Sequence, residues 1–145
     1  MTHNNARLQS AVIIVSDPDQ DSKILNIPAD ANGRTFTLDL TRGNTQLGRP
    51  RKIQMDDLPS ATRITLASRH LNSDGTPQWW MRLKTTHQTS KLDSHDVDYF
   101  VNGYLANDFI KEGLGIVVDA KTENNITRDT LGKVTVDTSP VPPTH

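Results

Sequence analysis

The chain has 145 residues, 34% of them hydrophobic, and a mean hydropathy of −0.57. This predicts one domain over residues 1–138 with a modest core, followed by a flexible proline-rich tail over residues 139–145. The absence of cysteine excludes disulfide frameworks, thiol nucleophiles and cysteine-ligated zinc. Because the N-terminus lacks a basic segment followed by a long apolar run, we expect a soluble, non-exported protein with no membrane partner.

The formal net charge of −1 is unevenly distributed along the chain. Between residues 42 and 91, nine basic residues stand against three acidic ones, a net charge of +6. Residues 1–41 carry −2 and residues 92–145 carry −5. A basic middle between acidic flanks is typical of a protein that meets a polyanion on one surface.

The N-terminal third predicts three strands and a loop. Two β-rich runs, 10–16 (SAVIIVS) and 22–28 (SKILNIP), are separated by the turn formers DPD, which predicts a hairpin. An Asn-Gly turn precedes residues 34–40 (RTFTLDL), whose strict alternation predicts a third strand with Phe36, Leu38 and Leu40 on one face. Residues 41–60 hold glycines and prolines around RKIQM, so we expect a loop with a brief central strand.

Residues 62–86 (TRITLASRHLNSDGTPQWWMRLKTT) predict a long hairpin of two alternating strands. Gly75 supplies the positive φ that the reversal needs. If Leu71 pairs with Gln78, Ser68 lies opposite Met81, and Leu66 opposite Leu83, on one apolar face. The other face then carries a basic and polar set: Arg63, Thr65, Ala67, Arg69, Trp80, Arg82, Lys84 and Thr86.

This second face carries the kinds of side chain that proteins use to bind RNA. Arginine and lysine neutralise phosphates, tryptophan offers a stacking surface to an unpaired base, and threonine hydroxyls read base or sugar edges. The alternative is the ordinary solvated outer face of a two-layer protein, where arginine and lysine are common.

Two interpretations compete for the next segment. Apolar residues at spacings of three and four, from Val97 to Phe109, predict a helix from about His95 to Glu112, capped by Ser94 and ended by Gly113. Alternatively, residues 97–105 form a strand and a helix runs from about residue 108 to residue 120, because Asn-Gly at 102–103 is a turn signature. Residues 126–131 predict a short helical or turn segment, and KVTVD predicts a last strand.

Motifs for catalysis and metal binding are missing from the sequence. The five histidines show no HExxH or HxH spacing, and no GxSxG element surrounds a serine. The aspartates at 17, 19 and 21 lack the glycine and the acid that a calcium loop requires, and GLG at 113–115 lacks a third glycine. We therefore expect no enzymatic reaction, no cofactor and no metal.

The order of these elements resembles the coat proteins of single-stranded RNA bacteriophages, the levivirus family. The residues that carry the resemblance are AVIIV and SKILNIP, then ADANGRTFTLDL, then TRITLASRHL with QWWMRLKTTH, and finally DFIKEGLGIVVDA and ITRDTLGK. The resemblance covers about residues 8–133. It implies an α+β fold, in which an antiparallel sheet with an N-terminal hairpin and one or two C-terminal helices is completed by an interlocked homodimer.

The resemblance also implies a function. In that family the open sheet face binds an RNA hairpin, the dimers assemble into an icosahedral shell, and the protein resides in the virion after assembly in the host cytoplasm. The RNA-binding set named above corresponds to that inward face. An apolar stripe on the expected helix predicts the dimer contacts Phe109, Ile110, Leu114 and Val117.

The alternative function is a small β-sandwich binding module of the lectin or membrane-lipid type. In that interpretation Trp79, Trp80 and nearby loops hold a sugar or a lipid headgroup. The closing LGKVTVDT is similar to the last strand of the aegerolysin-type β-sandwiches.

Overall fold

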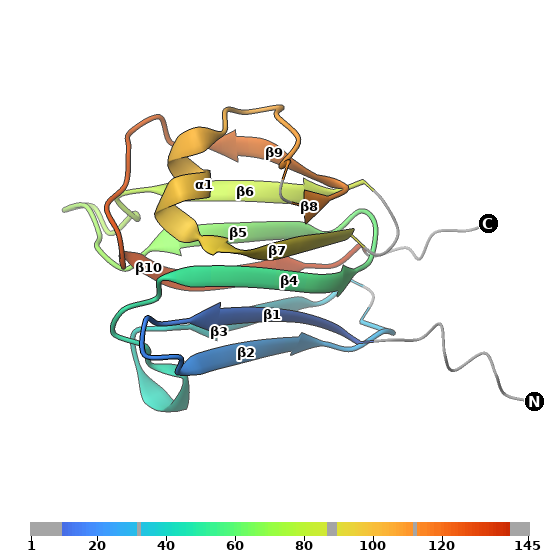
Figure 1. Ribbon diagram of the computed structural model, residues 1–145, viewed down its shortest axis with the longest axis horizontal. Helices are drawn as coiled ribbons and strands as arrows, with labels where there is room; N and C mark the ends of the chain where they lie inside the picture. The colour runs from blue at the N-terminus through green and yellow to red at the C-terminus, as the bar shows by residue number, and fades with distance from the viewer. Residues whose placement is uncertain (1–9, 32, 87–89, 112, 140–145) are drawn as a thin grey trace, which may run out of the picture.

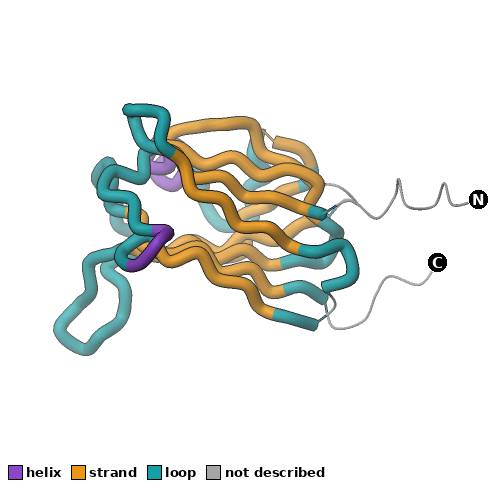
Figure 2. The backbone as a smooth tube through the Cα atoms, turned by 90° about the horizontal axis from the view of Figure 1, so that it is seen from below, coloured by secondary structure: helices purple, strands orange, loops and turns teal. Residues whose placement is uncertain are grey.

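The computed structural model describes residues 10–31, 33–86, 90–111 and 113–139, which form two five-stranded antiparallel sheets (Figure 1). The first sheet contains, in spatial order, β2 (Ser22–Ile27), β1 (Ala11–Ser16), β4 (Lys52–Leu58), β7 (Ser90–Asp96) and β8 (Gly113–Leu114). The second sheet contains β3 (Thr35–Asp39), β10 (Leu131–Asp137), β5 (Arg63–Ser68), β6 (Trp80–Thr85) and β9 (Ile116–Lys121). Figure 2 shows the sheets as two stacked layers.

The protein is therefore a β-sandwich, and the expected α+β fold with one or two C-terminal helices is wrong. The homodimer that the resemblance implies stays a prediction. Within the described residues, helix is limited to α1 (Val97–Gly103) and the single 3-10 turn η2 (Gly43–Thr45). Two sheets can bury their apolar faces against each other. No layer of helices is needed to cover either inner face.

Both interpretations of this segment are wrong in part: the helix is shorter than the first expected, and residues 97–103 are helical where the second expected a strand over residues 97–105. The helix begins near the expected place but ends at Gly103, because the Asn-Gly pair stops it. Ser94 belongs to β7, and Asp96 occupies the N-cap position without a side-chain capping bond. The alternative helix over residues 108–120 is replaced by β8 and β9, where β-branched IVV favours strand.

The predictions for the other strands are confirmed. The first two runs form the β1–β2 hairpin, RTFTLDL contains β3, and KVTVD lies within β10. The brief strand expected around RKIQM is longer: β4 has seven residues and lies between β1 and β7. Residues 126–130 are loop and turn rather than helix, and Leu131 begins β10.

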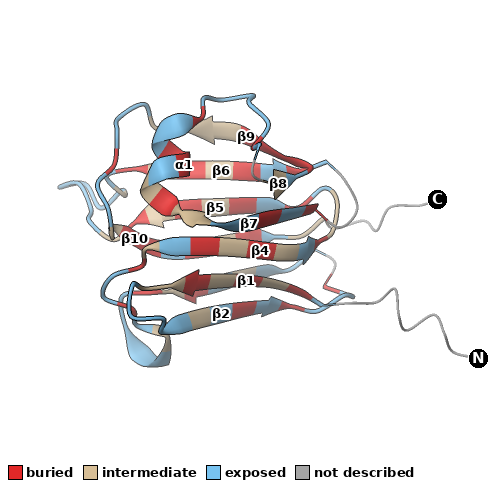
Figure 3. Ribbon diagram, in the orientation of Figure 1, coloured by how far each residue is buried: buried red, intermediate tan, exposed pale blue. Residues whose placement is uncertain are grey.

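The core lies between the sheets and is built by alternation along each strand (Figure 3). Ile13 and Met55 from the first sheet are fully buried, as are Leu66, Leu83 and Val134 from the second. Burial of each such side chain contributes about 1.5–3 kcal/mol to stability. Trp79 is also buried and donates from Nε1 to the Thr130 hydroxyl at 3.0 Å, so it is not available to a ligand as the alternative function expected.

The central hairpin has the predicted faces but a different register. Leu66 lies opposite Met81 rather than Leu83, a shift of two residues. One residue of the shift arises in the turn, where Leu71 bridges Pro77 instead of Gln78, and the other arises between Leu71 and Ala67, which lies opposite Trp80. Since side chains alternate with period two, an even shift leaves each on its predicted face. Gly75 has φ +89°, the positive value expected for it.

Polar side chains tie the sheets together at the loop end. The Arg51 guanidinium donates to the Asp129 carboxylate from Nε at 2.7 Å and from Nη2 at 3.0 Å, which joins the start of β4 to the β9–β10 connection. These bonds from Arg51 hold the pKa of Asp129 below its ordinary value. Lys121 donates from Nζ to the carbonyls of Val101 and Tyr104 at the end of α1, and burial lowers its pKa.

Gly132 lies in the irregular step of β10 between Leu131 and Lys133, packed against β5. A Cβ at this position would lie 2.5 Å from the Cα of Arg69. This distance is too short for any side chain, so glycine is required here for close approach of two backbones.

We predict that Gly132→Ala lowers the free energy of unfolding by about 1–3 kcal/mol, because the backbone of Arg69 must shift. Gly103→Ala is the matched control, since its Cβ would meet nothing within 4 Å. Chemical denaturation of both variants measures the difference. Equal stability of the two variants would contradict the close packing.

Candidate functional site

The sequence-predicted RNA-binding residues largely share the outer face of the second sheet. Arg63 lies opposite Lys84, and Thr65 opposite Arg82. Ala67 lies opposite Trp80, which is partly exposed. These six side chains alternate with the buried ones along β5 and β6.

Two members of the predicted set serve the fold instead. The Arg69 guanidinium donates to the backbone carbonyls of Leu131 at 3.1 Å, Leu47 at 2.6 Å and Gly48 at 3.4 Å. Thr86 donates from its hydroxyl to the carbonyl of Gly115 at 3.2 Å. Arg69 therefore joins the β3–β4 connection to β10, and its charge is largely directed at backbone oxygens.

An acidic residue that the sequence analysis missed moderates the charge of the outer face. Asp119, in the irregular step of β9, accepts from Arg82 Nε at 2.8 Å and lies 3.9 Å from Lys84 Nζ. The hydrogen bond from Arg82 lowers the pKa of Asp119, so the carboxylate remains charged at neutral pH. Arg82 also lies 5.8 Å from the centre of the Trp80 ring.

The residues predicted for the dimer interface do not form one stripe. Phe109 and Leu114 are exposed, whereas Ile110 and Val117 are buried within the chain. Phe109 bridges Val117 along the edge of β9. These four residues do not share a helix face, because they lie on β8, on β9 and in the segment that precedes β8.

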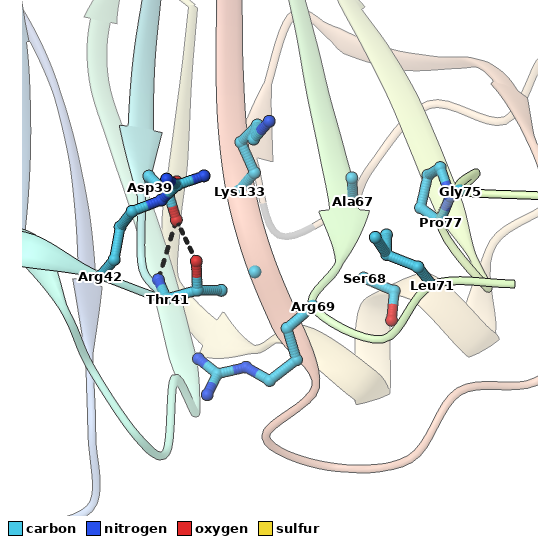
Figure 4. Close-up of a pocket in the computed structure, with 11 residues that line it drawn as sticks. Asp39, Thr41, Arg42, Ala67, Ser68, Arg69, Leu71, Gly75, Pro77 and Lys133 are labelled. Atoms are coloured by element: carbon cyan, nitrogen blue, oxygen red, sulfur yellow. Dashed lines mark hydrogen bonds and ion pairs between the residues drawn. The ribbon is translucent and has the colours of Figure 1, made fainter. Parts of the chain in front are cut away.

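A cleft of about 280 Å³ opens at the loop end of the outer face (Figure 4). Its floor is made by Ala67, Ser68 and Gly132, where β5 and β10 lie side by side. One wall is the β5–β6 turn, and the other comes from β3, β10 and the segment after β3. The cleft thus combines segments that are distant in sequence.

The turn wall is largely apolar. Leu71 is 57% exposed and lines the cleft together with Pro77 and Gly75. The turn is held by Asp74, whose Oδ1 accepts from the Thr76 backbone N–H at 3.0 Å and from its hydroxyl at 2.6 Å. These bonds lower the pKa of Asp74 and give the exposed wall a defined shape.

The opposite wall is charged. Asp39 accepts from the Thr41 hydroxyl at 2.6 Å, from the Thr41 N–H at 2.9 Å and from Arg42 Nε at 3.3 Å. The Thr41 bonds, with a smaller contribution from Arg42, hold the pKa of Asp39 below its ordinary value. Lys133 lies opposite Asp39 in the strand register and forms no ion pair within the described residues. Arg42, Lys133 and Arg69 all line the cleft together with Asp39, so three cationic side chains accompany one carboxylate there.

Comparisons with known proteins add no identification: no family model, no curated protein and no solved structure matches the chain. In the part of the chain that the structure describes, no group of three or more histidine, aspartate or glutamate side chains could hold a metal ion. No helix there is long and apolar enough to cross a membrane.

We predict that the Asp39 carboxyl has a pKa below its ordinary value in the folded protein and that Thr41→Val raises this pKa, because the variant lacks the hydroxyl donor. A depressed pKa means that this contribution to stability is present above the pKa of the unfolded chain and is lost as the pH falls through the lower pKa of the folded protein. NMR titration of the side-chain carboxyl measures the pKa. Arg42→Ala should raise it less, and the opposite order would contradict the assigned cause.

Proposed function

We propose that the protein is a non-catalytic β-sandwich binding module of the lectin or membrane-lipid type, with its ligand site in the loop-end cleft. The observation that supports this proposal is the cleft itself, which places an apolar wall across from a charged wall on a rigid sheet floor. Binding sites of this kind combine apolar contact area with a few placed polar groups.

The charges of the cleft favour a ligand with an anionic group. Arg42 and Lys133 are exposed, and Asp39 offsets one of them. The apolar side of Leu71 and Pro77 would contact the nonpolar face of a sugar ring or the glycerol region of a lipid headgroup. A phosphorylated headgroup and an acidic sugar share this chemistry, so a binding test must separate them.

We predict that Lys133→Ala weakens ligand binding by about tenfold or more, because a charge-assisted hydrogen bond is lost. The probes are vesicles containing an anionic phospholipid and an array of acidic glycans, with neutral vesicles and neutral glycans as references. Lys91→Ala is the matched control, since Lys91 is exposed on the first sheet. Binding to neither probe, or equal binding by both variants, would contradict the proposal.

A second candidate is the RNA-binding coat function, in which a shell of homodimers holds the genome inside a virion. One observation favours it: Trp80 shares the outer face with Arg63, Arg82 and Lys84. The fold that the coat-protein resemblance implies does not support this candidate. The two sheets cover each other's inner faces, and the described residues contain no layer of helices. Asp119 also reduces the positive charge that would meet phosphate.

If this face binds RNA, Asp119→Asn should strengthen binding and steepen its salt dependence by about one unit of slope, because Arg82 and Lys84 are released for phosphate. Asp93→Asn, on the first sheet, changes the net charge equally and is the control. Filter binding at several salt concentrations measures both. An effect of the same size in the two variants would contradict a specific role for this face.

A further inference from the structure

The four edges of the two sheets differ in how their backbone groups are satisfied. The edge of β9 is covered by the preceding segment. The N–H of Asn107 donates to the carbonyl of Val118, and the N–H of Val118 donates to the carbonyl of Asp108. One edge strand of the first sheet, β8, has only two residues and so offers a very short edge. The edge of β3 is partly closed, because the Thr45 hydroxyl donates to the carbonyl of Asp39.

Among the described residues, none covers the edge of β2 in this way. The N–H of Asp17 donates to the carbonyl of Asp21 at 2.9 Å, which sets the phase of the β1–β2 ladder. Lys23, Leu25 and Ile27 therefore direct their N–H and C=O groups toward β1. Ile24 and Asn26 direct theirs to the free edge, where none of the described residues bonds to them.

The outward-facing side chains along this edge also lack the usual protection against pairing, and Lys23, half-buried on the opposite face, is the one charged residue of β2. Ser22, Ile24 and Asn26 are exposed and uncharged, and Ile24 is 50% exposed beside Ile14 of β1. Edge strands normally carry charges, bulges or covering segments that prevent association with another strand. The pairing of β2 with β1 is regular over all six of its residues.

We infer that β2 is the surface through which two copies of this chain pair, antiparallel and about a two-fold axis, so that their first sheets become continuous. An unpaired row of backbone groups at strand spacing is complementary to another strand. A two-fold axis at Ile24 brings Ile24 of one copy opposite Ile24 of the other and Asn26 opposite Ser22. No charged side chains of like sign are then opposed along the exposed face.

Analytical ultracentrifugation of the full chain and of edge variants tests this inference. The wild type should form a dimer, and Asn26→Pro should raise its dissociation constant at least about tenfold, because two inter-copy hydrogen bonds are lost. Proline at residue 26 removes an N–H that the single chain does not use, so the β1–β2 ladder is kept. Thr37→Pro is the matched control, because Thr37 likewise directs its N–H to an edge, that of β3.

Amide hydrogen exchange gives a second measurement. The N–H groups of Ile24 and Asn26 should be protected at high protein concentration and should exchange quickly on dilution, whereas a strand that stays exposed shows fast exchange at both. A monomeric wild type at high micromolar concentration would overturn the inference. So would a dimer that survives Asn26→Pro, or one that is lost equally in Thr37→Pro.

Discussion

The burial of apolar side chains between two sheets is the constraint on which the rest of this structure depends. Ile13 and Met55 from one layer meet Leu66 and Leu83 from the other, all removed from water. To keep this contact, each strand must alternate apolar and polar residues, and the polar ones must face outward. The outer face, the loop-end cleft and the free edges are the parts of the molecule that remain available for binding.

Much of the positive charge in the middle of the sequence is used within the chain. Arg51 binds Asp129, Arg82 binds Asp119, and Arg69 binds backbone carbonyls. An arginine fork that already has acceptors gains less from a phosphate than a free one. The outer face is therefore less suited to a polyanion than its sequence indicates. The cleft keeps Lys133 without an ion pair in the described part of the chain.

The cleft and the β2 edge arise from different features of the same architecture. The cleft forms where a turn rises above the sheet, stiffened by the bonds from Thr76 to Asp74. The edge remains where a sheet ends and the chain supplies no further strand. The cleft lies on the second sheet and the β2 edge belongs to the first sheet. The proposed ligand and the proposed second copy would therefore not compete for one surface.

The sequence alone determined the features that depend on near neighbours. β-rich runs bounded by turn formers indicated β1 and β2, and KVTVD indicated β10. Alternation indicated β3 and separated the faces of the central hairpin, and Gly75 marked its turn, because composition, a period of two and a positive φ are local properties. Tertiary structure decided the rest. Apolar residues between 108 and 120 match helical spacing, yet the segment contains β8, which pairs with β7 of the first sheet, and β9, which pairs with β6 of the second. Asp119 reaches Arg82 across 37 residues, and only the pairing of β6 with β9 brings these side chains together.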